Sequence, residues 1–257
     1  MKHRYTQNRP KKSTLIAGYH AIVKALQEGP ALDRIYVQSA LTGEEVESIK
    51  ELAFTQGVPI NKVPVEKLNN FNVPNHRGFV AVISKVRYHK LQDVISFAVE
   101  KGETPFFLML EGITDIRNIG GIARTAHCCG VHALIIPEKG IGALNEDAIS
   151  TSAGALEELP VCRVASLVAA VEELHLNGIS VLATEMKSGK PVYEQALNLP
   201  VAIVMGSEDK GISSALLKAC DDALHIPMPG GFESLNVSAA TSMILYETMR
   251  QRLQNPS

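Results

Sequence analysis

The sequence predicts an α/β protein with a small N-terminal α/β domain followed by a larger domain built around a parallel sheet. Three observations predict this class. The chain has 257 residues, 46% of them hydrophobic, which is enough for one large core or two smaller ones. Beyond residue 90, strand-like apolar runs alternate with helix-like segments. Up to His89 there are 13 Lys plus Arg against 7 Asp plus Glu, whereas the remainder has 12 against 20, so the front is basic and suited to nucleic acid.

The first 12 residues carry five basic residues and no acid: Lys2, Arg4, Arg9, Lys11 and Lys12. This run predicts a flexible basic arm over residues 1–12 that binds RNA phosphates. A merely solvated tail is an equally good interpretation.

Residues 13–88 form the predicted front domain, in the order helix, strand, helix, short strand, loop, strand. The first helix covers 21–29 and stops at Gly29, and the first strand covers 34–38. An acidic helix then covers 42–57, ending at Gly57, and the last strand lies within 76–86. We expect this unit to contact nucleic acid.

Residues 89–257, linker included, form the predicted catalytic domain. A helix within 87–105 precedes strands at 106–112, 133–137, 180–186, 201–206 and 224–228, with helices at 118–130, 166–178, 213–220 and from Asn236 onward. Ligands of such sheets bind at the carboxyl ends of the strands. Three of these strands run into polar or glycine-containing loops, over residues 183–191, 205–213 and 227–236.

Several common site types are excluded. No GxGxxG follows the strand at Phe106, and the chain has neither a GxxxxGK[ST] phosphate loop nor a GxSxG nucleophile elbow. The four cysteines have no CxxC spacing, so we expect free thiols and no metal. The apolar runs fall short of the about 20 residues that span a bilayer, and no signal-like segment opens the chain, so a cytoplasmic location is expected.

The stretch NIGGIARTAHCCG contains an arginine that does not share the apolar stripe of its helix. Asn118 is expected to cap this helix, and the small residues after it allow close approach of a backbone or ligand. Arg124 falls off the stripe and can face a cleft; an ordinary surface arginine is the alternative.

Three long motifs carry a resemblance to a known family: LEGITDIRNIGGIARTAHCCGVHALIIP at 110–137, VMGSEDKGIS at 204–213 and IPMPGGFESLNVSAATSMILYE at 226–247. In order and spacing they resemble the SpoU (TrmH-type) branch of the SPOUT RNA methyltransferases. AGYHAIVKALQEG at 17–29 and HRGFVAVI at 76–83 resemble the ribosomal-protein-like RNA-binding domain of its rRNA-directed members.

The resemblance implies methyl transfer from S-adenosylmethionine to a ribose 2′-hydroxyl of RNA, by a homodimer whose C-terminal domain contains a deep trefoil knot. It implies that cofactor contacts come from Thr184, Gly206, Ile226, Met228 and Leu235. Apolar Ile226 and Leu235 suit the two faces of an adenine, and Gly206 suits a close backbone approach. The polar residues implied for catalysis are Asn118, Arg124, Glu208, Ser234 and Asn236.

Arg124 is the family's candidate for activating the hydroxyl. Because an arginine with a pKa above about 12 is a poor general base, we expect it to orient the ribose and phosphate and to stabilise the developing alkoxide. Ser234 is either a helix cap or a site residue. The small residues Ser238, Ala239, Ala240 and Ser242 are expected to allow tight contact with a second subunit.

One departure from the family pattern is that Asp209 and Lys210, rather than glycine, follow Glu208. Either this loop bends differently or Lys210 meets an RNA phosphate. Other expected RNA contacts are His20, Lys24, Arg77 and Arg87. The leading hypothesis is a guanosine of 23S-type rRNA as the target. A tRNA methyltransferase, a resistance-type rRNA methyltransferase and a non-catalytic RNA-binding or ribosome-assembly factor are the alternatives.

Overall fold

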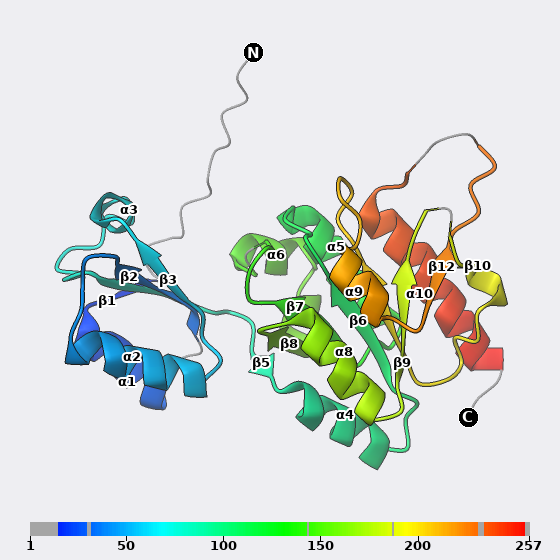
Figure 1. The fold of residues 1–257 in the computed structure, drawn as a ribbon, viewed down its shortest axis with the longest axis horizontal. Coiled ribbons are helices and arrows are strands. Elements are labelled where there is room, and N and C mark those ends of the chain that lie inside the picture. Colours follow the sequence, from blue (N-terminus) through cyan, green and yellow to red (C-terminus); the bar gives the residue numbers. More distant parts are fainter. Residues whose placement is uncertain (1–14, 30–31, 143, 187, 231–233, 255–257) are drawn as a thin grey trace. The chain divides into compact units, whose positions relative to one another are not determined.

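The computed structural model describes residues 15–29, 32–142, 144–186, 188–230 and 234–254 (Figure 1). The chain divides into two compact units, the first ending at Lys85 and the second beginning at Val86. The predicted basic arm, with Lys11 and Lys12, lies outside the described residues. None of the helices within the described ranges is long and apolar enough to cross a membrane.

The first unit is a four-stranded mixed sheet with strand order β1-β4-β2-β3. Strand β4 pairs antiparallel with β1 and β2, and β2 pairs parallel with β3. Helices α1 and α2 bury Ile22 and Ile49 against one face, whereas Leu68 of α3 packs against Val80 on the other. The elements are β1 (Leu15–Ala17), α1 (Tyr19–Glu28), β2 (Leu32–Gln38), α2 (Glu44–Thr55), β3 (Ile60–Val63), α3 (Val65–Asn69) and β4 (Phe79–Ile83).

The second unit contains an eight-stranded sheet in which every pairing is parallel, with strand order β10-β12-β9-β11-β6-β7-β8-β5. The predicted α/β class is therefore confirmed. The strands are β5 (Tyr88–His89), β6 (Phe106–Leu110), β7 (Ala133–Pro137), β8 (Val161–Val164), β9 (Ser180–Thr184), β10 (Lys190–Pro191), β11 (Val201–Met205) and β12 (Asp222–His225).

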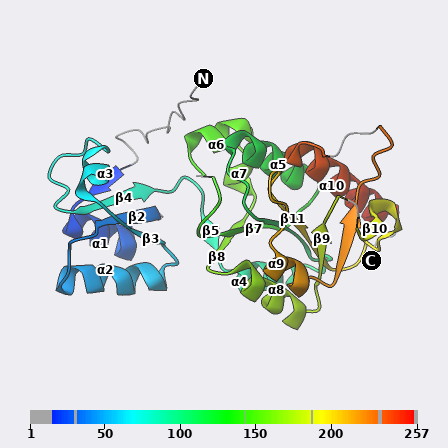
Figure 2. The ribbon, with the colours of Figure 1, turned by 45° about the horizontal axis from the view of Figure 1, so that its top comes forward.

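Helices cover both faces of this sheet (Figure 2). Helices α5, α6, α7 and α10 share one core with Phe106, Leu108 and Leu110 of β6, while α4, α8 and α9 share the other with Phe107 and Met109. Side chains along a strand alternate between faces, so an all-apolar strand such as β6 fills both cores. The helices are α4 (Leu91–Glu100), α5 (Ile116–Cys128), α6 (Glu146–Thr151), α7 (Ala155–Glu158), α8 (Leu167–Leu176), the 3₁₀ helix η2 (Val192–Glu194), α9 (Ser214–Ala219) and α10 (Val237–Gln254).

Several short elements were not predicted from the sequence: β1 and α3 in the first unit, and β5, α6, α7, β8, β10 and η2 in the second. Each has at most six residues. Such a segment has too few residues to show a hydrophobic period of 2 or 3.6, so its conformation depends on the strands and helices that it contacts.

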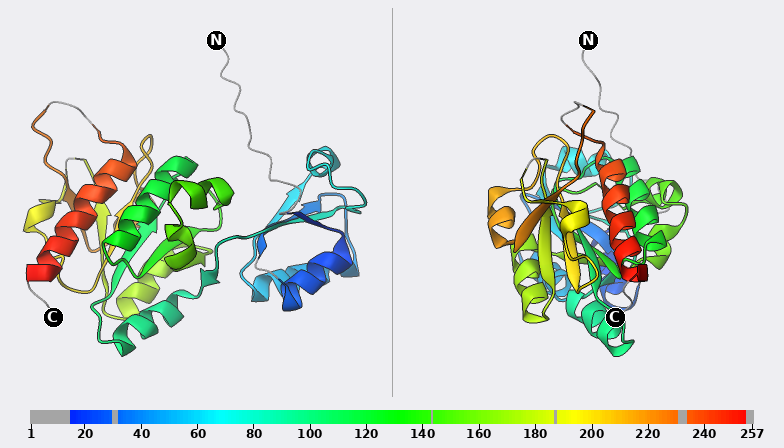
Figure 3. Two further views of the ribbon diagram at one scale, coloured as in Figure 1. Left: turned by 180° about the vertical axis from the view of Figure 1, so that it is seen from behind. Right: turned by 90° about the vertical axis from the view of Figure 1, so that its right-hand side faces the viewer.

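The strand order gathers three loops at one place. Strands β9, β11 and β12 are neighbours, and because the pairing is parallel their carboxyl ends lie at the same edge of the sheet. Helix α10, drawn in red, lies beside α5 on one face next to these ends (Figure 3). The three loops singled out in the sequence therefore meet.

Candidate functional site

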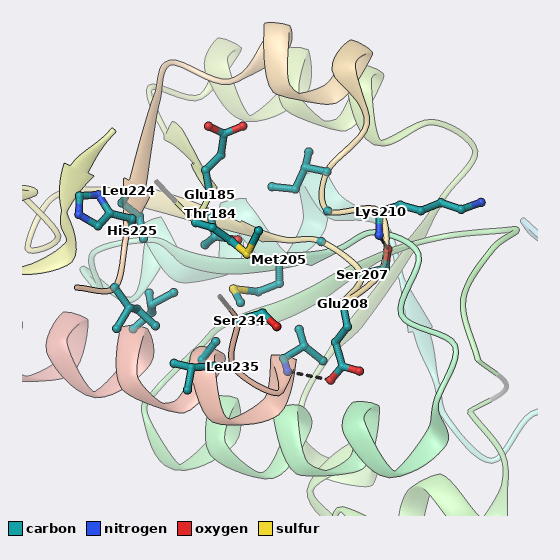
Figure 4. Close-up of a pocket in the computed structure, with 18 of the residues that line it drawn as sticks. Thr184, Glu185, Met205, Ser207, Glu208, Lys210, Leu224, His225, Ser234 and Leu235 are labelled. Atoms are coloured by element: carbon teal, nitrogen blue, oxygen red, sulfur yellow. Dashed lines mark hydrogen bonds between the residues drawn. The ribbon is translucent and has the colours of Figure 1, made fainter. Parts of the chain in front are cut away.

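A cavity of about 540 Å³ lies at the carboxyl ends of β9, β11 and β12 (Figure 4). All five residues that the resemblance implied for cofactor contact line it, namely Thr184, Gly206, Ile226, Met228 and Leu235. Glu208 and Ser234 line it too, whereas Asn118, Arg124 and Asn236 do not. The fold thus brings together residues from the three loops.

Short internal contacts fix the walls of this cavity. The Thr184 hydroxyl donates to the Val204 carbonyl at 2.8 Å, which ties the end of β9 to β11. A Cβ on Gly206 would lie 2.4 Å from the Gly211 carbonyl carbon. Position 206 therefore requires glycine because its own loop folds back onto it, whether or not a ligand is bound.

The loop after β11 closes without strain at the residues that depart from the family pattern. The backbones of Ser207 and Gly211 exchange two hydrogen bonds of 2.9 and 3.2 Å, and the positive φ of +64° falls on Gly211. Asp209 is not among the non-glycine residues with positive φ. Lys210 is exposed, and Figure 4 shows its side chain pointing away from the cavity.

Glu208 connects three segments that are distant in the sequence. Its Oε1 accepts hydrogen bonds from the Asn236 side-chain amide at 2.8 Å, the Val237 backbone N–H at 3.0 Å and the Asn118 side-chain amide at 3.3 Å. The Asn236 amide also donates to Asn118 Oδ1 at 3.0 Å. Because Val237 is the first residue of α10, the carboxylate also lies at the positive end of that helix.

The cap of α5 differs from the sequence prediction, and at the start of α10 the alternative that Ser234 is the helix cap is excluded. Asp115, not Asn118, caps α5, and its carboxylate accepts from the Arg117 N–H at 2.8 Å. This bond is the main reason that the pKa of Asp115 is lowered. Asn236, not Ser234, caps α10, since its Oδ1 accepts from Ser238 and Ala239 N–H at 3.0 and 3.3 Å. Each helix starts where a side-chain oxygen accepts from its free N–H groups. Because Asp115 caps α5, the Asn118 side chain is available to bond Glu208.

Arg124 lies on the exposed side of α5, and the described residues offer its guanidinium no hydrogen-bond or ion-pair partner. Six residues separate it from Asn118, which rotates it about two-thirds of a turn around the helix. Within one chain, Arg124 therefore does not face the cavity that Glu208 lines.

The small residues of α10 serve contacts within the chain, which corrects part of the predicted subunit contact. A Cβ on Gly121 would lie 2.6 Å from Ser238 Oγ, and the hydroxyls of Thr125 and Ser242 are 3.2 Å apart. Ser238 and Ser242 thus pack α10 against α5, because two helices approach closely only where side chains are small.

The first unit gathers predicted RNA contacts at one edge. The Gly18 N–H donates to the Phe79 carbonyl at 3.0 Å, which brings the segment before His20 next to the one after Arg77. His20, Lys24 and Arg77 are exposed, and Arg77 has a φ of +46°, rare for a residue other than glycine. Arg87 is exposed too but belongs to the second unit.

The cysteines are separate from the cavity. Burial raises the pKa of Cys162 to about 12 and that of Cys220 to about 11, which keeps both thiols protonated near neutral pH. Among the described residues, no three His, Cys, Asp or Glu side chains group as metal ligands.

Sequence reasoning did not assign several other lining residues to the cavity. In the three loops and adjoining strands these are Glu185, Met186, Ser188, Met205, Ser207, Leu224 and His225. On α10 they are Val237, Ala240 and Ile244, of which Ala240 was expected at a subunit contact instead. For Glu185, the available sequence signal was its position directly after the residues of strand β9.

Comparisons with known proteins agree with this arrangement. The model of the SpoU rRNA methylase family matches residues 105–246, and that of RNA 2′-O ribose methyltransferase substrate-binding domains matches residues 15–89. YacO of Bacillus subtilis (strain 168), named a TrmH family tRNA/rRNA methyltransferase, is 34% identical over 237 residues, or 92% of this chain and 95% of YacO.

Two solved structures are informative. The SpoU methyltransferase AviRb from Streptomyces viridochromogenes, in complex with the cofactor AdoMet, is 25% identical with a TM-score of 0.59, covering 94% of this chain and 91% of AviRb. A structure concerned with the 2-OH methylation of C/U34 on tRNA is also 25% identical, with a TM-score of 0.54. The match covers 59% of this chain and 99% of the chain in that structure.

Two of the three motifs line one cavity, and the first is bonded to them through Asn118 and Glu208. Two matching domain models and relatives similar over nearly the whole length agree with this arrangement: the chain belongs to the SpoU (TrmH-type) family of RNA methyltransferases.

Proposed function

We propose that this protein transfers a methyl group from S-adenosylmethionine to a ribose 2′-hydroxyl of RNA. The observation that carries the proposal is the cavity of about 540 Å³, in which five residues implied for cofactor contact line the walls beside Glu208. The lining fits an adenosyl cofactor, because apolar Leu224, Ile226 and Leu235 suit a flat base. When bound, S-adenosylmethionine supplies an electrophilic methyl group.

The chain's own contribution is then chiefly positioning. Glu208 Oε1 accepts one hydrogen bond each from the Asn118 and Asn236 side chains and a third from the Val237 N–H, and so fixes two amides next to the cavity. Holding the 2′-oxygen in line with the methyl group is the larger part of such a reaction. Ser234, which lines the cavity but does not cap α10, is available to contact the ribose.

We assign Arg124 the recognition of the RNA ribose and its adjacent phosphate. A guanidinium without a partner among the residues that the structure describes suits bidentate contact with a phosphate. Because Arg124 does not line the cavity of its own chain, this role needs a second chain.

A homodimer through α10 is therefore part of the proposal. Helix α10 exposes Met243, Tyr246 and Leu253, with fractional exposures of 50%, 60% and 75%. Spacings of three and then seven positions place these side chains within about 80° of one another around the helix, so they form one apolar stripe. A second copy would cover this stripe and contribute Arg124 near the RNA. The deep trefoil knot and the cytoplasmic location also stay predictions from the family resemblance.

The proposed substrate is large-subunit rRNA, with a guanosine as the modified nucleotide. Support comes from the matched substrate-binding domain at 15–89 and from its exposed basic residues His20, Lys24 and Arg77. The tRNA-directed structure matches only 59% of this chain while being itself 99% covered, so it is a shorter protein. The curated relatives carry both substrates in their names, which keeps tRNA as the second candidate.

The test is methyl transfer from radiolabelled S-adenosylmethionine to unmodified 23S-type rRNA and, in parallel, to bulk tRNA, followed by alkaline digestion. A 2′-O-methyl group removes the nucleophile that cleaves the next phosphodiester. We expect label in alkali-resistant dinucleotides from rRNA, and the dinucleotide then identifies the base.

Label in tRNA dinucleotides alone would replace the rRNA assignment with the tRNA one. Label in alkali-sensitive mononucleotides would contradict ribose methylation. A protein that binds RNA but no S-adenosylmethionine would be the non-catalytic assembly factor instead.

A further inference from the structure

Glu185 places a carboxylate in the cavity on the side opposite Glu208, whose neighbour Asp209 also lines the cavity (Figure 4). It directly follows β9, is half-buried and lines the cavity. In Figure 4 its side chain extends toward the α9 side, whereas Glu208 lies on the α10 side. Its backbone is fixed, since the Glu185 N–H donates to the Leu224 carbonyl at 3.0 Å.

The carboxylates of Glu185 and Glu208 differ in their hydrogen-bond partners. Glu208 accepts three hydrogen bonds through Oε1, whereas the Glu185 carboxylate has no hydrogen bond or ion pair with any residue that the structure describes. A half-buried carboxylate without donors loses hydration without compensation. The cavity therefore contains an acceptor available to the hydrogen-bond donors of a ligand.

Position in the cavity indicates which part of the cofactor would meet Glu185. If the proposed function holds, on which this inference rests, the reacting methyl group lies toward Glu208, Ser234 and Asn118. The opposite side then meets the adenosine half. An adenosine offers one pair of adjacent hydroxyl donors, on its ribose, and the two oxygens of one carboxylate can accept both. A carboxylate just after a parallel strand recognises ribose hydroxyls in other nucleotide-binding sheets.

We propose that Glu185 binds the 2′- and 3′-hydroxyls of the cofactor's ribose and so selects a ribonucleoside cofactor. It acts as a binding and specificity residue, with no part in the chemistry of the transfer.

The test is calorimetric binding to the full-length protein, with S-adenosylhomocysteine, 5′-methylthioadenosine and 2′-deoxy-5′-methylthioadenosine as probes. Three proteins are compared: the wild type, Glu185→Gln, and Glu194→Gln as a matched control on an exposed glutamate nine residues further along the chain. Equal melting temperatures establish that all three are folded.

We expect Glu185→Gln to raise the Kd of S-adenosylhomocysteine and of 5′-methylthioadenosine alike, by roughly tenfold, since hydrogen bonds to a charged group are lost. Removing the 2′-hydroxyl from the ligand is expected to weaken binding to the wild type and the control by a similar factor. For Glu185→Gln the same removal should have little further effect, because the two changes delete one interaction.

Three results would overturn the inference. An unchanged Kd for both ribonucleoside probes would show that Glu185 does not contact the ligand. A weaker S-adenosylhomocysteine complex with unchanged 5′-methylthioadenosine binding would assign Glu185 to the amino-acid part instead. A wild type that binds no probe would refute the proposed function itself, and this inference with it.

Discussion

Asn236 and Glu208 are joined by a hydrogen bond of 2.8 Å, although 28 residues separate them in the chain. Asn236 meanwhile caps α10 through its Oδ1, so a single side chain begins the last helix and binds the loop after β11. The start of α10 and the cavity wall are therefore coupled, and a change at Glu208 reaches both.

Replacing Glu208 with glutamine is expected to impair methyl transfer far more than folding. The glutamine side chain has the same shape as glutamate but no negative charge at the start of α10. Its NH₂ group would also be a donor beside the three N–H groups that now donate to Glu208 Oε1. Because Glu208 is exposed, we expect the free energy of unfolding to fall by only about 1 kcal/mol. Chemical denaturation and labelled-methyl transfer measure the two effects. Glu157→Gln, at an exposed position of α7 that does not line the cavity, is the control, and equal transfer rates for both variants would contradict the role of Glu208.

Adjacent glycines of α5 should respond differently to alanine. A Cβ at Gly120 would lie 2.6 Å from Thr151 Cβ and 3.0 Å from the Ser152 backbone nitrogen, whereas at Gly121 the close atom is the movable Ser238 Oγ at 2.6 Å. Alanine in a helix gains about 0.5–1 kcal/mol over glycine. We expect Gly121→Ala to be nearly neutral and Gly120→Ala to lower the free energy of unfolding by about 1–3 kcal/mol. Urea denaturation measures both, and the opposite ranking would contradict this packing.

Arg252 should matter for folding rather than for catalysis. Its guanidinium donates to the carbonyls of Leu197 and Leu199 and of Thr104 and Pro105, and it lies 4.7 Å from the centre of the Phe106 ring. Burial lowers its pKa to about 10, so the charge is retained at neutral pH through these acceptors. Lysine cannot reach all four carbonyls.

We therefore expect Arg252→Lys to lower the free energy of unfolding by about 2–4 kcal/mol, with no change in Kd for S-adenosylhomocysteine in the folded protein. Arg250→Lys, two residues earlier and paired only with α10 side chains, is the control and should leave the free energy of unfolding nearly unchanged. Equal losses in the two variants would refute the role given to Arg252.

Glu247 should contribute to acid sensitivity. Hydrogen bonds from Arg250 chiefly, and from Gln251, lower its pKa below the usual 4.5. A lowered pKa means that the unfolded chain binds a proton first, so this stabilisation is complete above pH 4.5 and is lost as the pH falls through the folded-state pKa. Glu247→Gln should therefore reduce the slope of melting temperature against pH below that point. Glu172→Gln, at an exposed position of α8, is the control. Identical slopes of melting temperature against pH for Glu247→Gln and wild type would contradict the prediction.

Tyr246 should control the oligomeric state. It is 60% exposed at the middle of the apolar stripe on α10, between Met243 and Leu253. An aspartate there would introduce charge into the proposed subunit contact, so we expect Tyr246→Asp to be a monomer by light scattering where the wild type is a dimer. Tyr193→Asp, at a similarly exposed tyrosine outside α10, is the control. A wild-type monomer would exclude the dimer.

Local sequence patterns predicted much of the second unit. The buried strands β6, β7, β9 and β11 each have five consecutive residues, most of them apolar, long enough to stand out from their surroundings. Since parallel strands end at one edge, the three loops after β9, β11 and β12 were expected to meet, and they do line one cavity. The five residues expected to contact the cofactor came from the family resemblance, and all five lie in that cavity.

Tertiary structure alone decided the partners of each side chain. Asn118 and Asn236 lie 118 residues apart, and their common contact with Glu208 depends on β6 and β11 being neighbours. Asp115 rather than Asn118 caps α5, and Ser238 packs against Gly121, because helix starts and helix contacts follow three-dimensional neighbours. A periodic pattern states which face of a helix is buried, but it does not contain the identity of what covers that face.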